Sequence, residues 1–288
     1  MKVAMGTFIS ISIDESKAEL LEPGFEIIKD IELSLSSYDS NAQIFKLNNT
    51  KKSFIDNYTY EALKLSEKYY VQTGGYFDIT VGSITKDLYR FGEDERIPSS
   101  KELYNATINF KGLFFNTQEA YIDDNIKLDL GGMGKGYAVD KVVEYFKSKH
   151  TKKAIVSASG DIRCLDRCHI DIQSPYSESF LASFDTLKYE TGITTSGNYK
   201  RYVKSTKNNH LINPKRKKPA QNFLSITLVS TISNSDLDAY ATAVSVMPKE
   251  KAYSFLDSIN VAYILLESNN KLIVSKNINR FVENLKMH

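Results

Sequence analysis

A glycine cluster near the middle of the chain is the feature that most constrains the fold. Residues 131–136 read GGMGKG, after the strand-like segment 126–130 (IKLDL). Apolar residues at helical spacing follow, among them Tyr137, Val142 and Phe146. Glycine lets a ligand approach the backbone closely, and the free amides at a helix N-terminus attract anions. The pattern therefore predicts a strand, a loop and a helix, with a candidate anion site at the loop.

The cluster does not by itself identify a nucleotide site. It matches neither GxxxxGK[ST] nor GxGxxG. The first motif needs a hydroxyl residue after the lysine, whereas Lys135 is followed by Gly136. Lys135 would bring a positive charge to a bound anion. A tight turn that packs a helix onto a strand explains the glycines equally well.

The remaining elements mix helices and strands without strict alternation. We expect strands at 7–13, 154–158, 261–267 and 271–275, and mostly strands between 160 and 230. Helices are expected from Pro23 to about Leu35, at 57–73 with Asn57 or Thr59 as cap, at 236–247 and near 249–258, while 85–125 looks polar and irregular. The 288 residues show no repeat and no low-complexity linker. They predict one α+β unit spanning 1–288.

Composition and charge exclude some classes of protein. The net charge is only +2, so nothing indicates a nucleic-acid partner. The basic run 215–218 (KRKK) lies between two prolines and is interpreted as a solvated loop before a phosphate patch. No apolar stretch is long enough for a membrane span, and the N-terminus lacks the apolar core of a signal peptide. We therefore expect no membrane span and a cytoplasmic location, or an exported lipoprotein form if a leader was removed.

The chain has only two cysteines, Cys164 and Cys168. They lack the further Cys or His pair of a zinc site. We expect both to be ordinary reduced residues.

Three segments carry candidate functional groups. In 235–244 (SDLDAYATAV), Asp238 and Thr242 stand four apart, so a helix would put both on one face as hard oxygen ligands for Mg²⁺. A capping or surface carboxylate is the alternative there. Segment 74–82 (GGYFDITVG) sets two aromatic residues beside a carboxylate, which suits a heteroaromatic ligand, or else a helix end that leads into a strand. His210 in HLINP is a lone histidine, and such residues are more often structural than catalytic.

Taken together, these segments resemble the ApbE family of FAD:protein FMN transferases. Eight blocks occur in family order along nearly the whole chain. They are MGTFISISI at 5–13, SYDSNAQIFKLN at 37–48, GYFDITVG at 75–82, LDLGGMGKGYAVD at 128–140, SASGDI at 157–162, TTSGNYKRY at 194–202, HLINP at 210–214 and DLDAYATA at 236–243. The resemblance implies a single compact T-fold-related domain, in which helices flank mixed sheets around an FAD-binding cleft.

The resemblance also implies roles for individual residues. The residues implied to contact FAD are Met5 and Tyr38 beside the ring systems, Tyr76, Phe77 and Asp78 along the site, Asp129 and Lys135 at the glycine loop, and Leu211. Those implied to hold Mg²⁺ are the Gly132 carbonyl, Asp238 and Thr242, with the Ala241 carbonyl close by. For proton handling we expect His210, whose unperturbed pKa near 6.5 suits a base at neutral pH, or alternatively Asp238.

Two departures from the family pattern stand out. The usual Gly-Gly-Asp is Ser159–Gly160–Asp161 here. The usual Asp-Pro-x-x-Gly is replaced by Asn213–Pro214 followed by Arg216–Lys217, without the glycine. The second change alters the loop after His210 and leaves the metal block untouched.

The implied activity is Mg²⁺-dependent transfer of FMN from FAD to a Ser or Thr hydroxyl of a target flavoprotein, with release of AMP. Water in place of the hydroxyl would make the chain an FAD pyrophosphatase. A non-catalytic flavin-binding module is the third possibility. The partners expected are FAD and a target flavoprotein.

Overall fold

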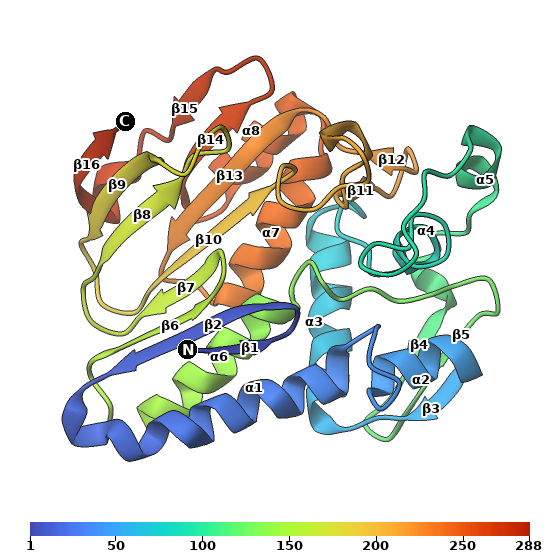
Figure 1. Cartoon of the computed structure of the whole chain (residues 1–288), viewed down its shortest axis with the longest axis horizontal. Helices are drawn as coiled ribbons and strands as arrows, with labels where there is room; N and C mark the ends of the chain where they lie inside the picture. Colours follow the sequence, from blue (N-terminus) through green and yellow to red (C-terminus); the bar gives the residue numbers. More distant parts are fainter.

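The computed structural model describes all 288 residues and is built around an antiparallel eight-stranded sheet (Figure 1). Its strands, in spatial order, are β1 (Lys2–Ala4), β2 (Thr7–Ile13), β6 (Ala154–Ala158), β7 (Asp161–Cys164), β10 (Thr191–Gly197), β13 (Phe223–Ser230), β14 (Ala262–Glu267) and β15 (Leu272–Val274). Neighbouring residues along a strand point to opposite faces of the sheet. On β13, for example, Leu228 joins the main core while Val229 joins a second core on the other face.

Three helices cover one face of this sheet, as Figure 1 shows. They are α1 (Leu21–Leu35), α6 (Gly134–Ser148) and α7 (Asn234–Val246); α6 packs between the other two, and α7 lies on β10 and β13. In α6 the residues predicted to form the apolar face, Tyr137, Val139, Val142, Val143 and Phe146, are all buried. The opposite face of the sheet is covered by a three-stranded sheet of β8 (His169–Gln173), β9 (Phe180–Thr186) and β16 (Val282–Met287).

Smaller elements surround these layers. The helices are α2 (Gln43–Thr50), α3 (Asn57–Gln72), α4 (Gly82–Thr85), α5 (Ser100–Asn105) and α8 (Lys249–Ser258), with short 3-10 turns η1 (Glu15–Leu20), η2 (Phe110–Gly112), η3 (Thr206–Asn208) and η4 (Ile278–Arg280). The strands are β3 (Lys52–Phe54), β4 (Leu113–Phe115) and β5 (Glu119–Ile122), which form one sheet, and the pair β11 (Ile212–Asn213) and β12 (Lys218–Pro219). The α+β class predicted from the sequence is confirmed.

Several local predictions were wrong. Residues 126–130 form no strand of a sheet, because their backbone is held by other partners: the Leu128 N–H donates to the Asn48 side chain at 2.7 Å, and the Asp129 N–H to the Ile79 carbonyl at 2.7 Å. The α3 helix is capped by Asp56 and not by Asn57 or Thr59, since the Asp56 carboxylate accepts from the Thr59 N–H at 2.7 Å.

Two more segments differ from expectation. The segment after Asp78 turns into α4 and does not continue as a strand, because the Asp78 carboxylate accepts from the Thr80 N–H at 2.8 Å and closes a local turn. The region 85–125, predicted to be irregular, contains α5, β4 and β5. These elements have only three to six residues, too few for a periodic pattern.

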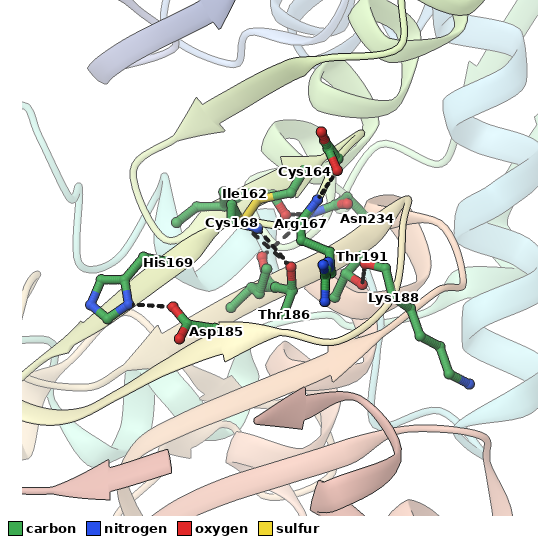
Figure 2. The surroundings of a disulfide bond; sticks show 12 residues. Ile162, Cys164, Arg167, Cys168, His169, Asp185, Thr186, Lys188, Thr191 and Asn234 are labelled. Carbon is green, nitrogen blue, oxygen red and sulfur yellow. Dashed lines mark hydrogen bonds and ion pairs between the residues drawn. A yellow bond between two sulfur atoms is a disulfide. The ribbon is translucent and has the colours of Figure 1, made fainter. Parts of the chain in front are cut away.

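The expectation of two reduced cysteines is also wrong, because Cys164 and Cys168 form a disulfide (Figure 2). Cys164 ends β7 and Cys168 directly precedes β8, so the bond spans the short turn between these two strands. That turn brings the two Cα atoms to 6.2 Å, within the range a disulfide can bridge. The Cys168 N–H also donates to the Thr186 hydroxyl at 2.9 Å, which ties the turn to β9.

We predict that this disulfide protects both thiols from alkylation. Unfolded protein treated with iodoacetamide should keep its mass when no reductant is present, and should gain two carbamidomethyl groups after reduction. Intact-mass spectrometry makes the comparison. Two added groups without reductant would show that the thiols are free.

Gly136 is a position where α6 lies too close to α7 for a side chain. A Cβ at this residue would lie 2.2 Å from the Asn234 carbonyl oxygen and 2.9 Å from the Asp238 Cβ. Both contacts are far shorter than van der Waals separation, so only glycine fits without moving a helix.

We therefore predict that Gly136→Ala lowers the free energy of unfolding by about 1–3 kcal/mol, the usual cost of overpacking a core. Gly134→Ala is the matched control, because a Cβ there would meet nothing closer than 3.6 Å. It should be neutral or slightly stabilising. Urea unfolding measures both variants, and equal midpoints would contradict the packing argument.

Candidate active site

A cavity of about 800 Å³ opens where the glycine loop, α7 and the segments after α1 and β10 meet. This volume is within the range of cofactor sites. Of the thirteen site residues predicted from the sequence, twelve line it: Met5, Tyr38, Tyr76, Phe77, Asp78, Asp129, Gly132, Lys135, His210, Leu211, Asp238 and Thr242. Ala241 is the exception, since it is fully buried in α7 and its carbonyl accepts from the Ser245 hydroxyl at 2.8 Å.

The glycine loop ends in a buried charge cluster. The Lys135 ammonium lies 3.1 Å from Asp161 Oδ2 and 3.3 Å from Asp238 Oδ2. Burial alone would lower the pKa of Lys135, but the two carboxylates outweigh it and raise that pKa above its ordinary value. Burial and the neighbouring Asp238 charge raise the pKa of Asp161. The Gly136 N–H also donates to Asp238 Oδ2 at 3.2 Å, so the α6 N-terminus faces an anion.

Asp161 was not among the residues predicted for the site. Asp161 is 1% exposed and lies behind Lys135. Its Oδ1 accepts a hydrogen bond from the Thr194 hydroxyl at 2.8 Å. The sequence did contain a signal, because Asp161 lies in the SASGDI block at 157–162. What the block could not reveal is that this carboxylate shares one lysine with Asp238, 77 positions further along the chain.

Oxygen donors suited to a divalent cation meet beside this cluster. The Thr242 hydroxyl donates to the Gly132 carbonyl at 3.2 Å, one helical turn after Asp238. Gly132 packs tightly here, because a Cβ would lie 2.9 Å from the Thr242 methyl. Carbonyl, hydroxyl and carboxylate oxygens are the ligands that Mg²⁺ takes. No group of three or more His, Cys, Asp or Glu residues could hold a metal alone. The donors present fit Mg²⁺, which usually completes its shell with water and substrate phosphates.

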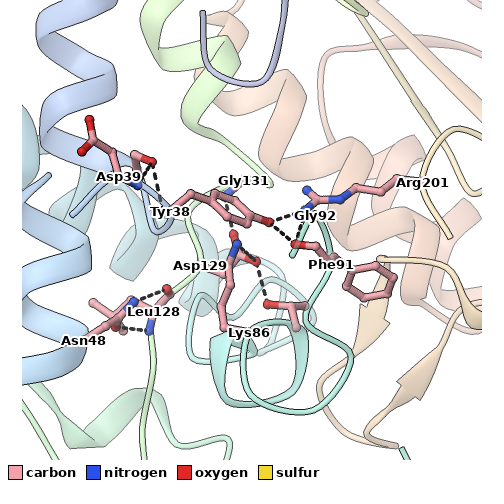
Figure 3. A network of polar contacts seen from close by, with 12 residues as sticks. Tyr38, Asp39, Asn48, Lys86, Phe91, Gly92, Leu128, Asp129, Gly131 and Arg201 are labelled. Atoms are coloured by element: carbon pink, nitrogen blue, oxygen red, sulfur yellow. Dashed lines mark hydrogen bonds and ion pairs between the residues drawn. The ribbon is translucent and has the colours of Figure 1, made fainter. Parts of the chain in front are cut away.

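The opposite wall is a polar network around Tyr38 and Asp129, shown in Figure 3. The Asp129 carboxylate accepts from the Thr85 hydroxyl at 2.6 Å and from the Gly131 N–H at 3.0 Å, and it lies 3.7 Å from the Lys86 ammonium. Burial opposes ionisation, but the Lys86 charge and these hydrogen bonds prevail and lower the pKa of Asp129 to about 2. Asp129 is therefore a fixed anionic acceptor at neutral pH.

Tyr38 covers this wall. Its ring lies over the Lys86 ammonium, 3.2 Å from Nζ to the ring centroid, and its hydroxyl donates to the Phe91 carbonyl at 2.9 Å. Arg201 donates to the same carbonyl at 2.8 Å and also contacts the Tyr38 hydroxyl. Arg201 belongs to the TTSGNYKRY block, whereas no sequence pattern marked Lys86.

The remaining aromatic and acidic residues divide between cavity and core. Phe77 is 3% exposed and packs edge-to-face on Tyr69, so it serves the core as well as the cavity wall. One oxygen of Asp78 already accepts from Thr80, and burial raises the pKa of Asp78 to about 6. Tyr76 carries the Lys215 ammonium 4.5 Å above its ring centroid. The basic run predicted as a solvated loop therefore reaches the edge of the cavity.

His210 lies in the cavity wall with its ring held in one orientation. Nδ1 is 3.1 Å from the Arg201 carbonyl, which can only accept, so Nδ1 carries the proton and Nε2 keeps its lone pair. Phe91 packs edge-to-face against the ring. Burial, together with the nearby charges of Arg201 and Lys135, lowers the pKa of His210 to about 4. The pKa is therefore well below the unperturbed value near 6.5, and the ring is neutral at pH 7.

We predict opposite titrations for two histidines of this chain. His210 should titrate near pH 4. His169 should titrate above its ordinary 6.5, because its ring pairs with Asp185 at 2.7 Å. Between pH 4 and 6.5 the unfolded state binds a proton that folded His210 refuses, so this residue makes stability fall as pH drops through that window. NMR titration of the ring protons tests both, and a His210 value near 6.5 would contradict the buried arrangement.

Comparisons with known proteins agree with this architecture. Residues 5–265 match the ApbE family. An FAD:protein FMN transferase of Klebsiella pneumoniae is 23% identical over 95% of this chain and 90% of its own length, and one of Buchnera aphidicola is 26% identical over 82% and 75%. The ApbE protein of Thermotoga maritima superposes with a TM-score of 0.88 at 23% identity over 98% of both chains. The flavin transferase ApbE of Vibrio cholerae does so with a TM-score of 0.81 at 22% identity over 97% of both chains.

The match to the family extends over most of the chain and includes the glycine loop, the His210 segment and α7. The protein therefore belongs to the ApbE family.

Proposed function

We propose that this protein transfers the FMN half of FAD to a Ser or Thr hydroxyl of a target flavoprotein, with a divalent cation, and releases AMP. The observation that carries the proposal is the cavity itself. It combines a cationic glycine loop, a set of hard oxygen donors and a neutral histidine, which are the groups that breaking a diphosphate requires. The names of the curated relatives support the same activity.

The chemistry exchanges the phosphoanhydride bond of the FAD diphosphate for a phosphoester bond to the acceptor. The acceptor oxygen attacks the phosphorus of the FMN half, the bond from that phosphorus to the bridging oxygen breaks, and AMP leaves with the bridging oxygen. The hydroxyl proton passes to a base. Lys135 and the amides of the glycine loop would stabilise the negative charge that grows on the diphosphate oxygens.

The Gly132 carbonyl, Asp238 and Thr242 are the residues that would hold Mg²⁺, with Ala241 close by in α7. A bound divalent cation would neutralise charge on the diphosphate and on the leaving AMP. Ala241 is the weakest member of the set, because its carbonyl already accepts the Ser245 hydroxyl.

His210 is the proposed proton acceptor. Nε2 has a free lone pair at pH 7, and the Arg201 carbonyl fixes the ring through Nδ1. A pKa of about 4 makes His210 a weak base, but negative phosphates beside it would raise that pKa. The rival base is Asp238, whose Oδ2 is already shared between Lys135 and the Gly136 amide.

The opposite wall would bind the flavin and adenine ends. Asp129 is an acceptor for ring N–H groups, and Tyr38, which is 39% exposed, offers an aromatic ring. Met5 borders the cavity from the β1–β2 turn, and Tyr76 and Leu211 close its other side. An aromatic ring system stacks on such groups with little cost in conformational entropy.

The compartment stays a prediction. No helix in the structure combines the length and the apolar character needed to cross a membrane. The cytoplasmic location was expected from the lack of a visible signal peptide, whereas a disulfide is more typical of oxidising compartments.

Mass spectrometry of a candidate flavoprotein, incubated with the protein, FAD and Mg²⁺, tests the proposal. Transfer predicts an FMN ester on one Ser or Thr and an equal amount of AMP. Free FMN and AMP without labelled protein would indicate a pyrophosphatase. If FAD remains unchanged, the protein is a non-catalytic flavin-binding module.

We predict that Asp238→Asn lowers the rate of AMP release by about 100-fold or more, because losing a bound cation forfeits several kcal/mol of transition-state stabilisation. Asp236→Asn is the matched control, since Asp236 lies on the same helix but pairs with Lys68 at 2.6 Å, outside the cavity. Chromatography of released AMP gives the rates. Equal rates for the two variants would contradict the role of Asp238.

A further inference from the structure

The Lys135 ammonium contacts two carboxylates, and one of them, Asp238, is also a proposed ligand of the divalent cation. Asp161 comes from β7, Asp238 from α7 and Lys135 from the first turn of α6. Asp161 and Asp238 are 1% and 2% exposed, so water screens their charges poorly. The lysine is the only positive side chain within 4 Å of either carboxylate.

Both carboxylates have partners that stabilise the ionised form. The two oxygens of Asp161 face the Lys135 ammonium and the Thr194 hydroxyl, and Asp238 Oδ2 accepts from both Lys135 and the Gly136 N–H. An ammonium has only protons to offer, so it favours a charged carboxylate opposite. With both carboxylates ionised, the two carboxylates and one ammonium carry a net charge of −1.

We propose that Lys135 is a built-in competitor of the divalent cation for Asp238, and that Asp161 adjusts the competition without binding the metal. This inference rests on the cation of the proposed function. Asp161 does not line the cavity, whereas Lys135 and Asp238 do. A divalent cation at Asp238 would leave the cluster with a net charge of +1, which a buried site tolerates poorly.

The diphosphate of FAD resolves this imbalance. Its negative charge lets the cation and Lys135 remain together, with the lysine turned from Asp238 towards the phosphates. Cation and FAD should therefore bind with positive coupling, and the cation alone should bind weakly. Lys135 thus prevents the cation from occupying the site before the substrate arrives.

A purely structural ion pair predicts a different outcome. If Lys135 only stabilised the fold, its removal would weaken FAD binding and cation binding together. Competition predicts opposite signs, with tighter cation binding and weaker FAD binding. The sign of the change in cation affinity therefore separates the two.

The experiment measures binding of Mn²⁺, a paramagnetic substitute for Mg²⁺, to the full chain by electron paramagnetic resonance. Without FAD, Lys135→Met should bind Mn²⁺ at least about 10-fold more tightly than the unmodified protein. The size follows from the 10- to 1,000-fold effect that a close charge has on binding of another cation, the proton. Lys135→Arg should restore the original weak binding.

Asp161→Asn should change the Mn²⁺ affinity in the opposite direction to Lys135→Met. It keeps the side-chain shape but removes one negative charge behind the site, so Mn²⁺ affinity should fall by about 10-fold although Asp161 is no ligand.

Lys141→Met is the control for loss of a lysine from α6, because Lys141 pairs with Glu61 at 2.7 Å, away from the cavity. It should leave Mn²⁺ affinity unchanged. Urea unfolding confirms that each variant is folded, and if Lys135→Met is not, Asp161→Asn decides alone.

The outcomes separate the inference from the proposed function. If the unmodified protein binds Mn²⁺ with FAD, and Asp238→Asn abolishes that binding, the metal site stands. Lys135→Met binding no tighter than the unmodified protein would then overturn the competition alone, as would an unchanged affinity in Asp161→Asn. If the unmodified protein binds no Mn²⁺ even with FAD, both the metal role and the competition are wrong.

Discussion

The close approach of α6 and α7 is the constraint on which the rest of the site depends. Gly136 leaves no room for a side chain against the Asn234 carbonyl, so the first turn of α6 lies directly on α7. This contact sets Lys135 beside Asp238 and brings the Gly132 carbonyl within hydrogen-bond distance of Thr242. Glycines that looked ambiguous in the sequence therefore serve both packing and the candidate anion site.

Charge balance follows from this packing. The helices and the sheet bury two carboxylates beside the partly exposed Lys135, and another part of the cavity wall pairs the partly exposed Asp129 with the buried Lys86. Removing one partner of a buried pair leaves an uncompensated charge, which is costly. The carboxylates in these two parts of the cavity wall are therefore held by different sets of partners. Asp129 has several donors in place, whereas Asp238 shares its one charged partner, Lys135, with Asp161.

The sequence was sufficient for features carried by long patterns. The α6 helix, the strand at 7–13 and the shared face of Asp238 and Thr242 all appear as predicted, because helical and alternating periodicity extend over many residues. Features made by contacts between distant residues were missed. Lys86 follows no motif and acts only through Asp129 and Tyr38, and Asp161 matters because it shares a lysine with Asp238. The disulfide was missed because spacing alone cannot distinguish a turn from a helix.

The central claim is that the glycine loop and α7 together hold the diphosphate of FAD with a divalent cation. Crystals grown with FAD and Mn²⁺, measured at the manganese absorption edge, test this most directly. The account predicts one anomalous peak, bounded by Asp238, Thr242 and the Gly132 carbonyl, with the FAD diphosphate beside it and the flavin or adenine ring near Tyr38. A manganese peak elsewhere, or FAD bound with its diphosphate away from Lys135, would contradict it.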